Sequence, residues 1–461
     1  MPAALSAKLA LARGAGALSR LRGGGGTSVP GKVLLRLQPD AIATLGSSLA
    51  EGSALISATN GKTTTAAMAA GILQQADVRA VHNRSGANME GGIAATLLAA
   101  AKRDGRIDGE LGLFEVDELW LGSIARQLNP RAILLGNLFR DQLDRYGELE
   151  TIVENWAELI ATLPTGLVLN ADDPAIADLG DGHEALYFGV EDERLARDGM
   201  AHAADAKHCR RCGSPYVFDA VFLGHLGHYH CPSCGHGRPR PHVYASDVRL
   251  QGVRRASFKL TTPAGEAEVE LALPGLYNVY NALGAAALAH RLGVELDAIV
   301  AGLSATAPAF GRAETVNLSL AGGRHRELRI LLVKNPAGAN EVLRTLALEP
   351  GEHDLLGVLN DRIADGRDVS WIWDADFELL AGRVRSVTCS GTRASDLAVR
   401  LKYAGVEPGR ITIERDLPAA LERAGAQGDG SGPLYALPTY TAMLTLRDHL
   451  VARGETSSAW S

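Results

Sequence analysis

Residues 54–65 read ALISATNGKTTT, an apolar run followed by a polar turn and then by residues with helical composition. The apolar run predicts a buried strand, so the glycine and the lysine fall between a strand and a helix. In that context, the N–H groups that open the helix can bind phosphate, together with a lysine ammonium and a hydroxyl that ligates Mg²⁺. We therefore expect a phosphate loop with Thr63 as magnesium ligand, whose nucleotide-binding residues are Asn60, Gly61, Lys62, Thr63 and Thr64.

The loop departs from the general phosphate-loop pattern, because Ile56 stands where the distal glycine is usual. An ordinary capped helix start is therefore the alternative. Acidic residues add support, since the apolar run 111–116 contains Glu115 and is followed by Asp117 and Glu118. Carboxylates at the carboxyl edge of a parallel sheet can hold the Mg²⁺ that accompanies a nucleotide, although acids are also common at solvated strand ends.

The rest of the chain repeats the order strand, loop, helix, which predicts parallel sheets covered by helices. We expect an α/β fold with four parts: a basic N-terminal segment, a central nucleotide-binding domain, a module inserted into that domain, and a second α/β domain. These parts span residues 1–45, 46–310, 200–240 and 311–461, in that order. A proline and a glycine between two regions of strand–helix alternation indicate the boundary near residue 310.

Charge and composition exclude several classes of protein. The 461 residues include 46 Lys and Arg against 53 Asp and Glu, a net charge of −7, which argues against a protein that binds nucleic acid by neutralising phosphates. No apolar run is long enough to span a membrane. The first 39 residues are basic and contain no acid. We expect a surface helix there, with peripheral contact to a membrane as the alternative.

Four of the five cysteines form two Cys-x-x-Cys pairs, Cys209 with Cys212 and Cys231 with Cys234, separated by 18 residues. Each pair can offer two thiolates to one tetrahedral ion, so we expect a structural Zn²⁺ site, with redox dithiols as the alternative. Alternative ligands are three nearby histidines, His225, His228 and His230. So few cysteines cannot form a disulfide scaffold, which suits a reducing, cytoplasmic location.

Four segments resemble the Mur ligases, ATP-dependent enzymes of peptidoglycan synthesis, and follow the order of that family's motifs. They are SATNGKTT at 57–64, LNADDP at 169–174, GLYNVYNA at 275–282 and FGRAE at 310–314. The resemblance narrows to the MurT family, the ligase-like subunits of lipid II isoglutaminyl synthases. The further motifs of that family are NLFRDQ at 137–142, KNPAG at 334–338 and DGRDVSWIWD at 365–374.

The resemblance implies a Mur ligase central domain that binds ATP and Mg²⁺, and the spacing of the four cysteines adds a zinc ribbon inserted in that domain. It also implies a Rossmann-like C-terminal domain that closes over the nucleotide. By motif, Glu115 would bind the magnesium ion, and Asn278 and Asn281 would contact the nucleotide. Arg312 would reach the phosphates from the second domain.

The chain departs from the Mur ligase pattern at three points. Ala58 occupies a position where a glycine is usual. No lysine lies between Lys102 and Lys207 to match the carbamylated lysine of many family members. About 50 residues precede the loop, too few for the usual UDP-binding domain, so we expect a substrate that is not held by a UDP handle.

The resemblance further implies the reaction, an amidation of the α-carboxyl of D-glutamate in the lipid II stem peptide to D-isoglutamine. ATP would convert the carboxyl into an acyl phosphate, ammonia would displace the phosphate, and ADP would be released. Lys62 and Glu115 would act by positioning and charge neutralisation. Two alternatives are an amino-acid-adding ligase of the Mur or folylpolyglutamate type and a zinc-ribbon P-loop ATPase that acts on nucleic acid.

Release of ammonia from glutamine calls for a cysteine nucleophile with a histidine base, and the chain offers only Cys389 outside the two pairs. Because Cys389 ends an apolar strand and lacks a glycine two residues before it, we interpret it as a buried core thiol. The resemblance supplies a partner, a GatD-like glutamine amidotransferase subunit, and implies that Asp368 completes the Cys/His pair of that partner. Without the resemblance, Asp368 would be interpreted as a helix cap and the tryptophans after it as core.

Overall fold

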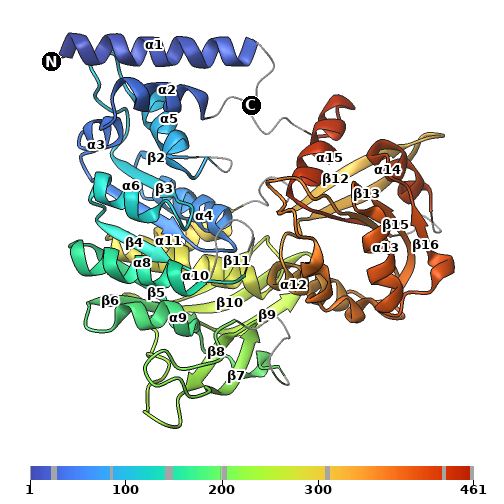
Figure 1. Ribbon diagram of the computed structural model, residues 1–461. Helices are drawn as coiled ribbons and strands as arrows, with labels where there is room; N and C mark the ends of the chain where they lie inside the picture. Colours follow the sequence, from blue (N-terminus) through green and yellow to red (C-terminus); the bar gives the residue numbers. More distant parts are fainter. Residues whose placement is uncertain are drawn as a thin grey trace.

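Two β-sheets organise the chain in the computed structural model, which describes residues 2–21, 28–83, 87–140, 149–197, 199, 205–306, 312–427 and 432–456. The elements up to residue 304 surround a nine-stranded sheet, and those from residue 312 surround a six-stranded sheet. The two bodies lie side by side, and the second is the smaller (Figure 1). The predicted α/β fold class is confirmed.

The nine-stranded sheet has the order β11-β10-β9-β6-β5-β4-β1-β3-β2. Its parallel strands are β1 (Ser53–Ser57), β2 (Ala80–His82), β3 (Leu111–Glu115), β4 (Ala132–Leu135), β5 (Gly166–Asn170), β6 (Ala185–Val190) and β9 (Val243–Gln251). The sheet is extended by an antiparallel hairpin of β10 (Arg255–Thr262) and β11 (Gly265–Leu271). Because β1 lies between β4 and β3, the loops that follow these three strands meet at one edge of the sheet.

Helices cover both faces of this sheet, because successive side chains of a strand point to opposite faces. Ile56 of β1 faces a core shared with α4 (Lys62–Gln75), α10 (Leu276–Arg291) and α11 (Leu296–Ser304). Leu55 faces the opposite core, shared with α5 (Glu90–Ala100), α6 (Leu121–Leu128) and α8 (Leu149–Thr162). Short helices follow β5 and β6, namely α9 (Pro174–Ala177), η1 (Asp178–Gly180) and η2 (Glu193–Leu195).

The N-terminal residues form three helices, α1 (Pro2–Leu21), α2 (Val29–Leu37) and α3 (Ala41–Gly46). Their buried side chains, Leu9 among them, belong to the core beneath α5. Arg13 donates hydrogen bonds to the backbone carbonyls of Leu98 and Ala101 at the end of α5. The basic N-terminal segment therefore packs against the central domain. Within the described residues, no helix combines the length and the apolar character needed to cross a membrane.

The inserted module is a two-stranded ribbon, placed in the chain between β6 and β9 and built from β7 (Val217–Leu223) and β8 (Leu226–His230). It lies at the end of the first body opposite to α1 (Figure 1). Gly224, in the turn between the two strands, has a φ of +61°, a left-handed conformation that glycine adopts without strain.

The six-stranded sheet has the order β12-β13-β17-β14-β15-β16. Its parallel strands are β13 (Arg324–Leu331), β14 (His353–Val358), β15 (Val384–Ser390), β16 (Ile411–Ile413) and β17 (Leu434–Pro438). β12 (Arg312–Leu320) pairs antiparallel with β13 at one edge. The expected domain boundary at residues 310 and 311 lies outside the described residues.

Helices cover both faces of the second sheet as well. One face packs against α12 (Pro336–Ala347), α13 (Ala394–Tyr403), η3 (Ser370–Trp373) and η4 (Phe377–Leu380). The other face packs against α14 (Leu417–Ala426) and α15 (Tyr440–Ala452). The short η5 (Pro408–Arg410) leads into β16.

Candidate nucleotide site and four-cysteine cluster

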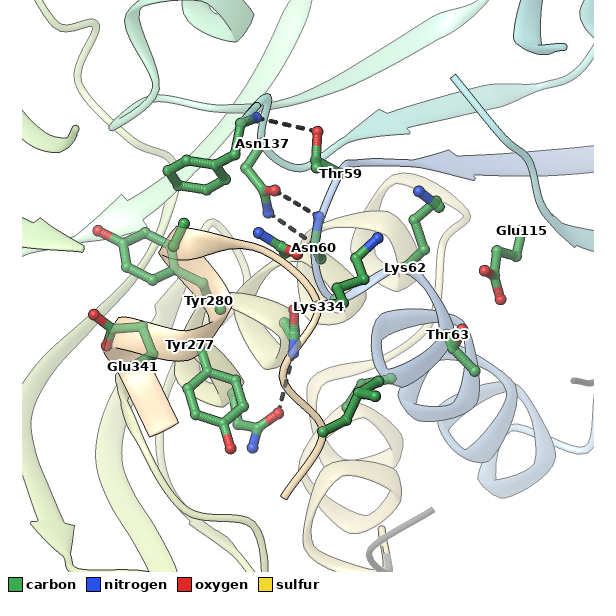
Figure 2. Close-up of a pocket in the computed structure, with 18 of the residues that line it drawn as sticks. Thr59, Asn60, Lys62, Thr63, Glu115, Asn137, Tyr277, Tyr280, Lys334 and Glu341 are labelled. Carbon is green, nitrogen blue, oxygen red and sulfur yellow. Dashed lines mark hydrogen bonds between the residues drawn. The ribbon is translucent and has the colours of Figure 1, made fainter. Parts of the chain in front are cut away.

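The predicted phosphate loop joins β1 to the first turn of α4 and is held in shape by neighbouring amides. The backbone N–H of Asn60 donates to the Asn137 side chain (2.9 Å), which in turn donates to the Asn60 carbonyl (3.0 Å) (Figure 2). Gly61 has a φ of +85°, and a Cβ there would lie 2.0 Å from Asn281 Oδ1. Only glycine fits this position, and the first residues of α4, which follow it, line a cavity.

Lys62, the first residue of α4, is buried beside the acids that follow β3. Its Nζ donates to Glu118 Oε2 (2.9 Å) and to the carbonyl of Ala58. Burial lowers the pKa of Lys62, but the carboxylates of Glu118, Glu115 and Asp117 raise it, and the net result is a raised pKa. The side chain is therefore an ammonium at neutral pH. The expected meeting of the loop and the strand-end acids follows from the β1–β3 pairing.

Glu115 presents a buried carboxylate to the same cavity. Its side chain is only 3 % exposed, and Oε2 has no hydrogen-bond partner among the described residues. Asn83 holds the backbone of Glu115 through two hydrogen bonds of 2.8 Å. Thr63 lines the cavity too, and Figure 2 shows both residues on the same side of the loop. Because an unpartnered buried carboxylate is costly, this pair of oxygen donors fits a hard cation such as Mg²⁺.

The two predicted nucleotide-contacting asparagines lie in α10, and both line the cavity. Asn281 Nδ2 donates to Asn278 Oδ1 (3.0 Å), and Asn278 Nδ2 donates to the Pro274 carbonyl (2.7 Å). Asn281 Oδ1 also accepts a hydrogen bond from Thr65 in α4 (3.3 Å). The sequence did not predict this second role of the two asparagines, which is to support the helix that follows the phosphate loop through hydrogen bonds.

The cavity has a volume of about 350 Å³ and lies between the two bodies. The C-terminal body contributes lining residues from the turn before α12, from α12 itself, and from the start of α15: Lys334, Ala337, Gly338, Glu341 and Tyr440. The sequence did not single out the residues at its apolar end, which are Phe139, Leu223, Leu226, Leu273, Tyr277 and Tyr280. Phe139, Tyr277, Tyr280 and Lys334 stand inside the family motifs, whereas Leu223 and Leu226 carry no sequence signal.

Contacts across the cavity fix how the two bodies meet. Asn335 Nδ2 donates to Asn60 Oδ1 (3.0 Å), which links the phosphate loop to α12. Arg197 forms two hydrogen bonds with the buried carboxylate of Glu341 (2.8 and 3.0 Å). Arg312 begins β12 of the second body, and its side chain lies outside the described structure.

Asp368 lies on the surface of the C-terminal body and does not line the cavity. Its Oδ1 accepts a hydrogen bond from the Ser370 N–H (2.8 Å), and the side chain and backbone of Ser370 lower the pKa of the carboxyl. Trp371 is buried, but Trp373 is 52 % exposed and lies against Tyr403, which is 71 % exposed. The core interpretation of the tryptophans is therefore right for Trp371 and wrong for Trp373.

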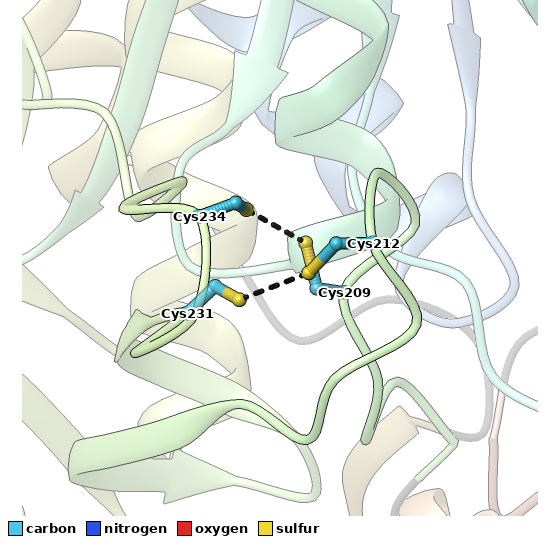
Figure 3. Close-up of side chains that lie close together, drawn as sticks. All are labelled: Cys209, Cys212, Cys231 and Cys234. Atoms are coloured by element: carbon cyan, nitrogen blue, oxygen red, sulfur yellow. Dashed lines mark hydrogen bonds between the residues drawn. The ribbon is translucent and has the colours of Figure 1, made fainter.

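The four paired cysteines form one cluster in the ribbon (Figure 3). The Cys209 and Cys234 sulfurs are 3.7 Å apart, those of Cys212 and Cys231 are 3.4 Å apart, and all four lie within 4.8 Å. Zn–S bonds of about 2.3 Å place tetrahedral sulfurs about 3.8 Å apart, so the four thiols fit one such ion. Each Cys-x-x-Cys turn closes on a left-handed glycine, Gly213 (φ +75°) or Gly235 (φ +72°).

The other candidate sulfur and nitrogen ligands lie outside this cluster. His228 contacts the Val190 carbonyl (2.9 Å) and His230 contacts Asp219 (2.9 Å). His225 is fully buried, 3.4 Å from Asp173. Cys389 is buried in β15, and burial raises the pKa of its thiol to about 12, which does not suit a nucleophile.

Comparison with known proteins gives two family matches and close relatives. The Mur ligase middle domain model matches residues 56–224, and the MurT ligase C-terminal model matches residues 332–443. The MurT subunit of lipid II isoglutaminyl synthase (glutamine-hydrolyzing) from Streptococcus pneumoniae is 33 % identical over 95 % of this chain and 94 % of its own length. The same subunit from Staphylococcus aureus is 32 % identical over 95 % of this chain and 96 % of its own length.

Solved structures show the same fold. A pseudomurein peptide ligase type C from Methanothermus fervidus has a TM-score of 0.66 at 24 % identity, covering 88 % of this chain and 79 % of its own. MurF from Acinetobacter baumannii has a TM-score of 0.63 at 19 % identity, covering 93 % of this chain and 81 % of its own. A Mycobacterium tuberculosis folylpolyglutamate synthase complexed with ADP has a TM-score of 0.60 at 17 % identity, covering 91 % of this chain and 94 % of its own. The expected Mur ligase fold is confirmed.

Proposed function

Because the chain belongs to the MurT family, we propose that it catalyses the ATP-dependent amidation of lipid II at the α-carboxyl of the stem-peptide D-glutamate. The observation that carries this proposal is the identity of 33 % over 95 % of the chain to a lipid II isoglutaminyl synthase subunit. Family membership favours amidation over an amino-acid-adding ligase and over an ATPase that acts on nucleic acid.

The proposed reaction has two steps. A carboxylate oxygen of the substrate attacks the γ-phosphorus of ATP, the bond to the bridging oxygen breaks, and ADP leaves with an acyl phosphate formed. Ammonia then attacks the carbonyl carbon. The C–O bond breaks, phosphate leaves with its electron pair, and the nitrogen releases one proton to give the carboxamide. Such a reaction needs alignment of charged reactants and neutralisation of phosphate charge more than it needs acid–base chemistry.

The residues around the cavity suit these needs. The Lys62 ammonium would bind the β- and γ-phosphates, exchanging its present contact with Glu118 for the nucleotide. The N–H groups of Gly61, Thr63 and Thr64 lie at the helix start that would bind the phosphates, and Asn60 lines the same cavity. Thr63 and Glu115 would hold Mg²⁺, which when bound neutralises phosphate charge. Asn278 and Asn281 would contact the nucleotide, and Arg312 would approach from the second body.

We propose that a GatD-like glutaminase subunit supplies the ammonia, since the relatives are named as subunits of a glutamine-hydrolysing enzyme. Cys389 is buried in the sheet, which leaves this chain without an accessible cysteine beyond the four-cysteine cluster within its described residues. Asp368, with Trp373 and Tyr403 exposed on the same body, offers an ionised carboxylate and an aromatic surface for such a partner. We place the complex in the cytoplasm, at the inner face of the membrane that holds a lipid-linked substrate, with at most peripheral membrane contact.

The function is tested by incubating the purified chain with lipid II, ATP, Mg²⁺ and ammonium, and by weighing the product. We expect a mass lower by the difference between OH and NH₂, with one ADP released per amide. Glutamine should replace ammonium once a GatD-like subunit is added. An amino-acid-adding ligase would instead raise the product mass when amino acids are supplied. Absence of ADP release with lipid II and ammonium would contradict the proposal.

We propose that the four-cysteine cluster holds one structural Zn²⁺, because four thiolates leave no open position for water. Replacing Cys212 with serine should lower the zinc content of the purified protein from about one ion per chain to near zero, and lower its melting temperature by several degrees. Metal analysis and thermal unfolding measure both effects. Cys389→Ala is the matched control, because it removes a buried thiol outside the cluster and should leave the zinc content unchanged. Wild-type protein purified without any bound metal would contradict this prediction.

A further inference from the structure

We infer that the tip of the inserted ribbon, residues 223–226, forms the wall of the cavity that receives the nucleotide base, so that the four-cysteine cluster controls affinity for the base. The inference rests on the proposed nucleotide site. It assigns to the ribbon a role in the reaction that neither the sequence nor its motifs indicated.

The ribbon tip is part of the central domain and not an appendage in solvent. Leu223 and Leu226 are 5 % and 1 % exposed, and both line the cavity. They belong to the same core as Phe139, Tyr280 and the helices α4 and α10. The turn that joins β7 to β8 therefore reaches the nucleotide cavity, while the cysteines lie at the other end of the two strands.

Close contacts tie the tip to the phosphate loop. A Cβ on Gly224 would lie 2.7 Å from the Phe139 ring, so the backbone of the turn lies directly against that ring. The His225 and Phe139 ring centroids are 4.6 Å apart. The N–H of Phe139 donates to Thr59 Oγ1 (3.1 Å), at the first residue of the phosphate loop. A displaced tip would therefore move Phe139 and reshape the cavity next to the loop.

A second set of contacts anchors the ribbon through Asp172, in the motif that follows β5. The N–H of Gly227 donates to the Asp172 carbonyl (2.9 Å), directly after the tip. The Asp172 carboxylate accepts hydrogen bonds from Tyr280 (2.6 Å) and from Arg238, after the second cysteine pair (2.6 Å). Tyr280 itself lines the cavity. One carboxylate, that of Asp172, is therefore hydrogen-bonded both to the ribbon and to a residue that lines the apolar end of the cavity.

The chemistry of the cavity assigns the nucleotide base to the apolar end, which the ribbon tip lines. Lys62 and Glu115 lie at the start of α4, whereas Tyr277 and Tyr280 lie on the opposite side of the phosphate loop, beside the Glu341 carboxylate (Figure 2). That carboxylate is paired with Arg197. Phosphates belong at the charged end. A flat heteroaromatic base gains most by leaving water for aromatic and aliphatic side chains, which here are Phe139, Leu223, Leu226, Leu273, Tyr277 and Tyr280.

The cluster acts on the tip because it joins the two Cys-x-x-Cys turns at the far end of the ribbon, where the local core is small. The core there consists of Ala177, Cys209, Tyr216, Tyr229 and Cys231, and two of its five buried members are cysteines of the cluster. So small a core needs a metal or another crosslink to keep a fixed shape. Loss of the metal should therefore loosen β7 and β8, and with them the position of Leu223 and Leu226.

The test compares a probe that carries a base with one that does not. We would measure the affinities of a non-hydrolysable ATP analogue and of inorganic tripolyphosphate, each with Mg²⁺, by calorimetry on the full chain. For Leu226→Ala we expect a rise in Kd for the ATP analogue of about tenfold, and for tripolyphosphate a change of less than about twofold. Cys212→Ser should give the same pattern. Leu226→Met should keep most of the wild-type affinity, because methionine fills a volume similar to that of leucine.

Leu195→Ala is the matched control, since Leu195 packs on the same core without lining the cavity, and it should leave both affinities unchanged. Unchanged affinity for the ATP analogue in both Leu226→Ala and Cys212→Ser would overturn the inference. An equal loss for both probes in folded variants would also overturn it, because the tip would then act on the phosphate loop. Wild-type protein that binds neither probe would overturn the proposed function itself, an outcome that differs from the other two.

Discussion

Lys62→Met should lower the rate of lipid II amidation with ammonium by at least about 10²–10³-fold, a loss typical for removal of one group that neutralises developing charge. The reason is local: Lys62 is the buried cation at the start of α4, and its Nζ faces the carboxylates that follow β3. Without it, the γ-phosphate would meet Glu115, Asp117 and Glu118 without the buried ammonium that pairs with Glu118. ADP release per minute, measured with saturating ATP and Mg²⁺, checks the prediction.

Lys402→Met is the control, because Lys402 is exposed on α13, away from the cavity, and its replacement removes the same charge. It should keep the wild-type rate. Lys62→Arg keeps the charge and changes the shape of the donor group. Its rate should remain well below wild type, because a planar guanidinium does not reproduce the contacts of a compact ammonium with the Ala58 carbonyl and Glu118. A Lys62→Met variant that folds and keeps more than about a tenth of the wild-type rate would show that the phosphates bind elsewhere.

The same contacts predict how the stability of the protein depends on pH. Burial opposes the charge of Lys62, but three carboxylates outweigh it and hold the folded-state pKa above the ordinary 10.5. A raised pKa stabilises the folded state fully at pH values below the ordinary pKa, and that stabilisation is lost only as pH rises through the folded-state value. The stability difference between wild type and Lys62→Met should therefore be constant between pH 7 and pH 9, as thermal unfolding can measure.

The charged half of the site could be predicted from the sequence because its signals are local. The loop 59–64 lies between an apolar run and a helix. Glu115 lies near the end of another apolar run, residues 111–116. In an α/β sheet, both fall at the same edge, and the β1–β3 pairing brings them together. The sequence did not reveal which acid contacts Lys62, which turned out to be Glu118, because that depends on the turn after β3.

The apolar half of the site could not be predicted in this way. Leu223 and Leu226 look like the ends of two ordinary strands, and nothing near them indicates a cavity. Their position follows from packing against Phe139 and α10, residues at least 50 positions away in the chain. Strand β12 is a different case, because Val316, Leu318 and Leu320 alternate with polar residues and could have been recognised as a strand.

Asp368→Asn should abolish amidation driven by glutamine and leave amidation driven by ammonium within about twofold of wild type. The expected loss with glutamine is about 10⁴-fold, the loss seen when a carboxylate that orients a catalytic histidine becomes an amide. Asp368 suits this role because it lies on the surface of the C-terminal body, outside the cavity where ATP would bind. Ser370 fixes its carboxylate and lowers its pKa, so it is ionised at neutral pH.

Two further variants separate orientation of a histidine from docking of the partner. Asp374→Asn removes an exposed carboxylate from the same segment and should leave both rates unchanged. Trp373→Ala should instead weaken the complex with the glutaminase subunit by about 10- to 100-fold, because an exposed aromatic side chain at an interface contributes mostly to affinity. With the partner in excess, Trp373→Ala should regain glutamine-driven activity, and Asp368→Asn should not.

The pattern of these rates decides between two roles for the C-terminal body. If Asp368→Asn lowers the ammonium-driven rate as much as the glutamine-driven rate, the turn at residues 365–370 serves ATP chemistry or the fold, and the division of work between two subunits is wrong. If only the glutamine-driven rate falls, the carboxylate acts on chemistry that this chain cannot perform by itself. The second result is expected from the geometry, because Cys389 is buried in β15 and Asp368 is exposed and does not line the nucleotide cavity.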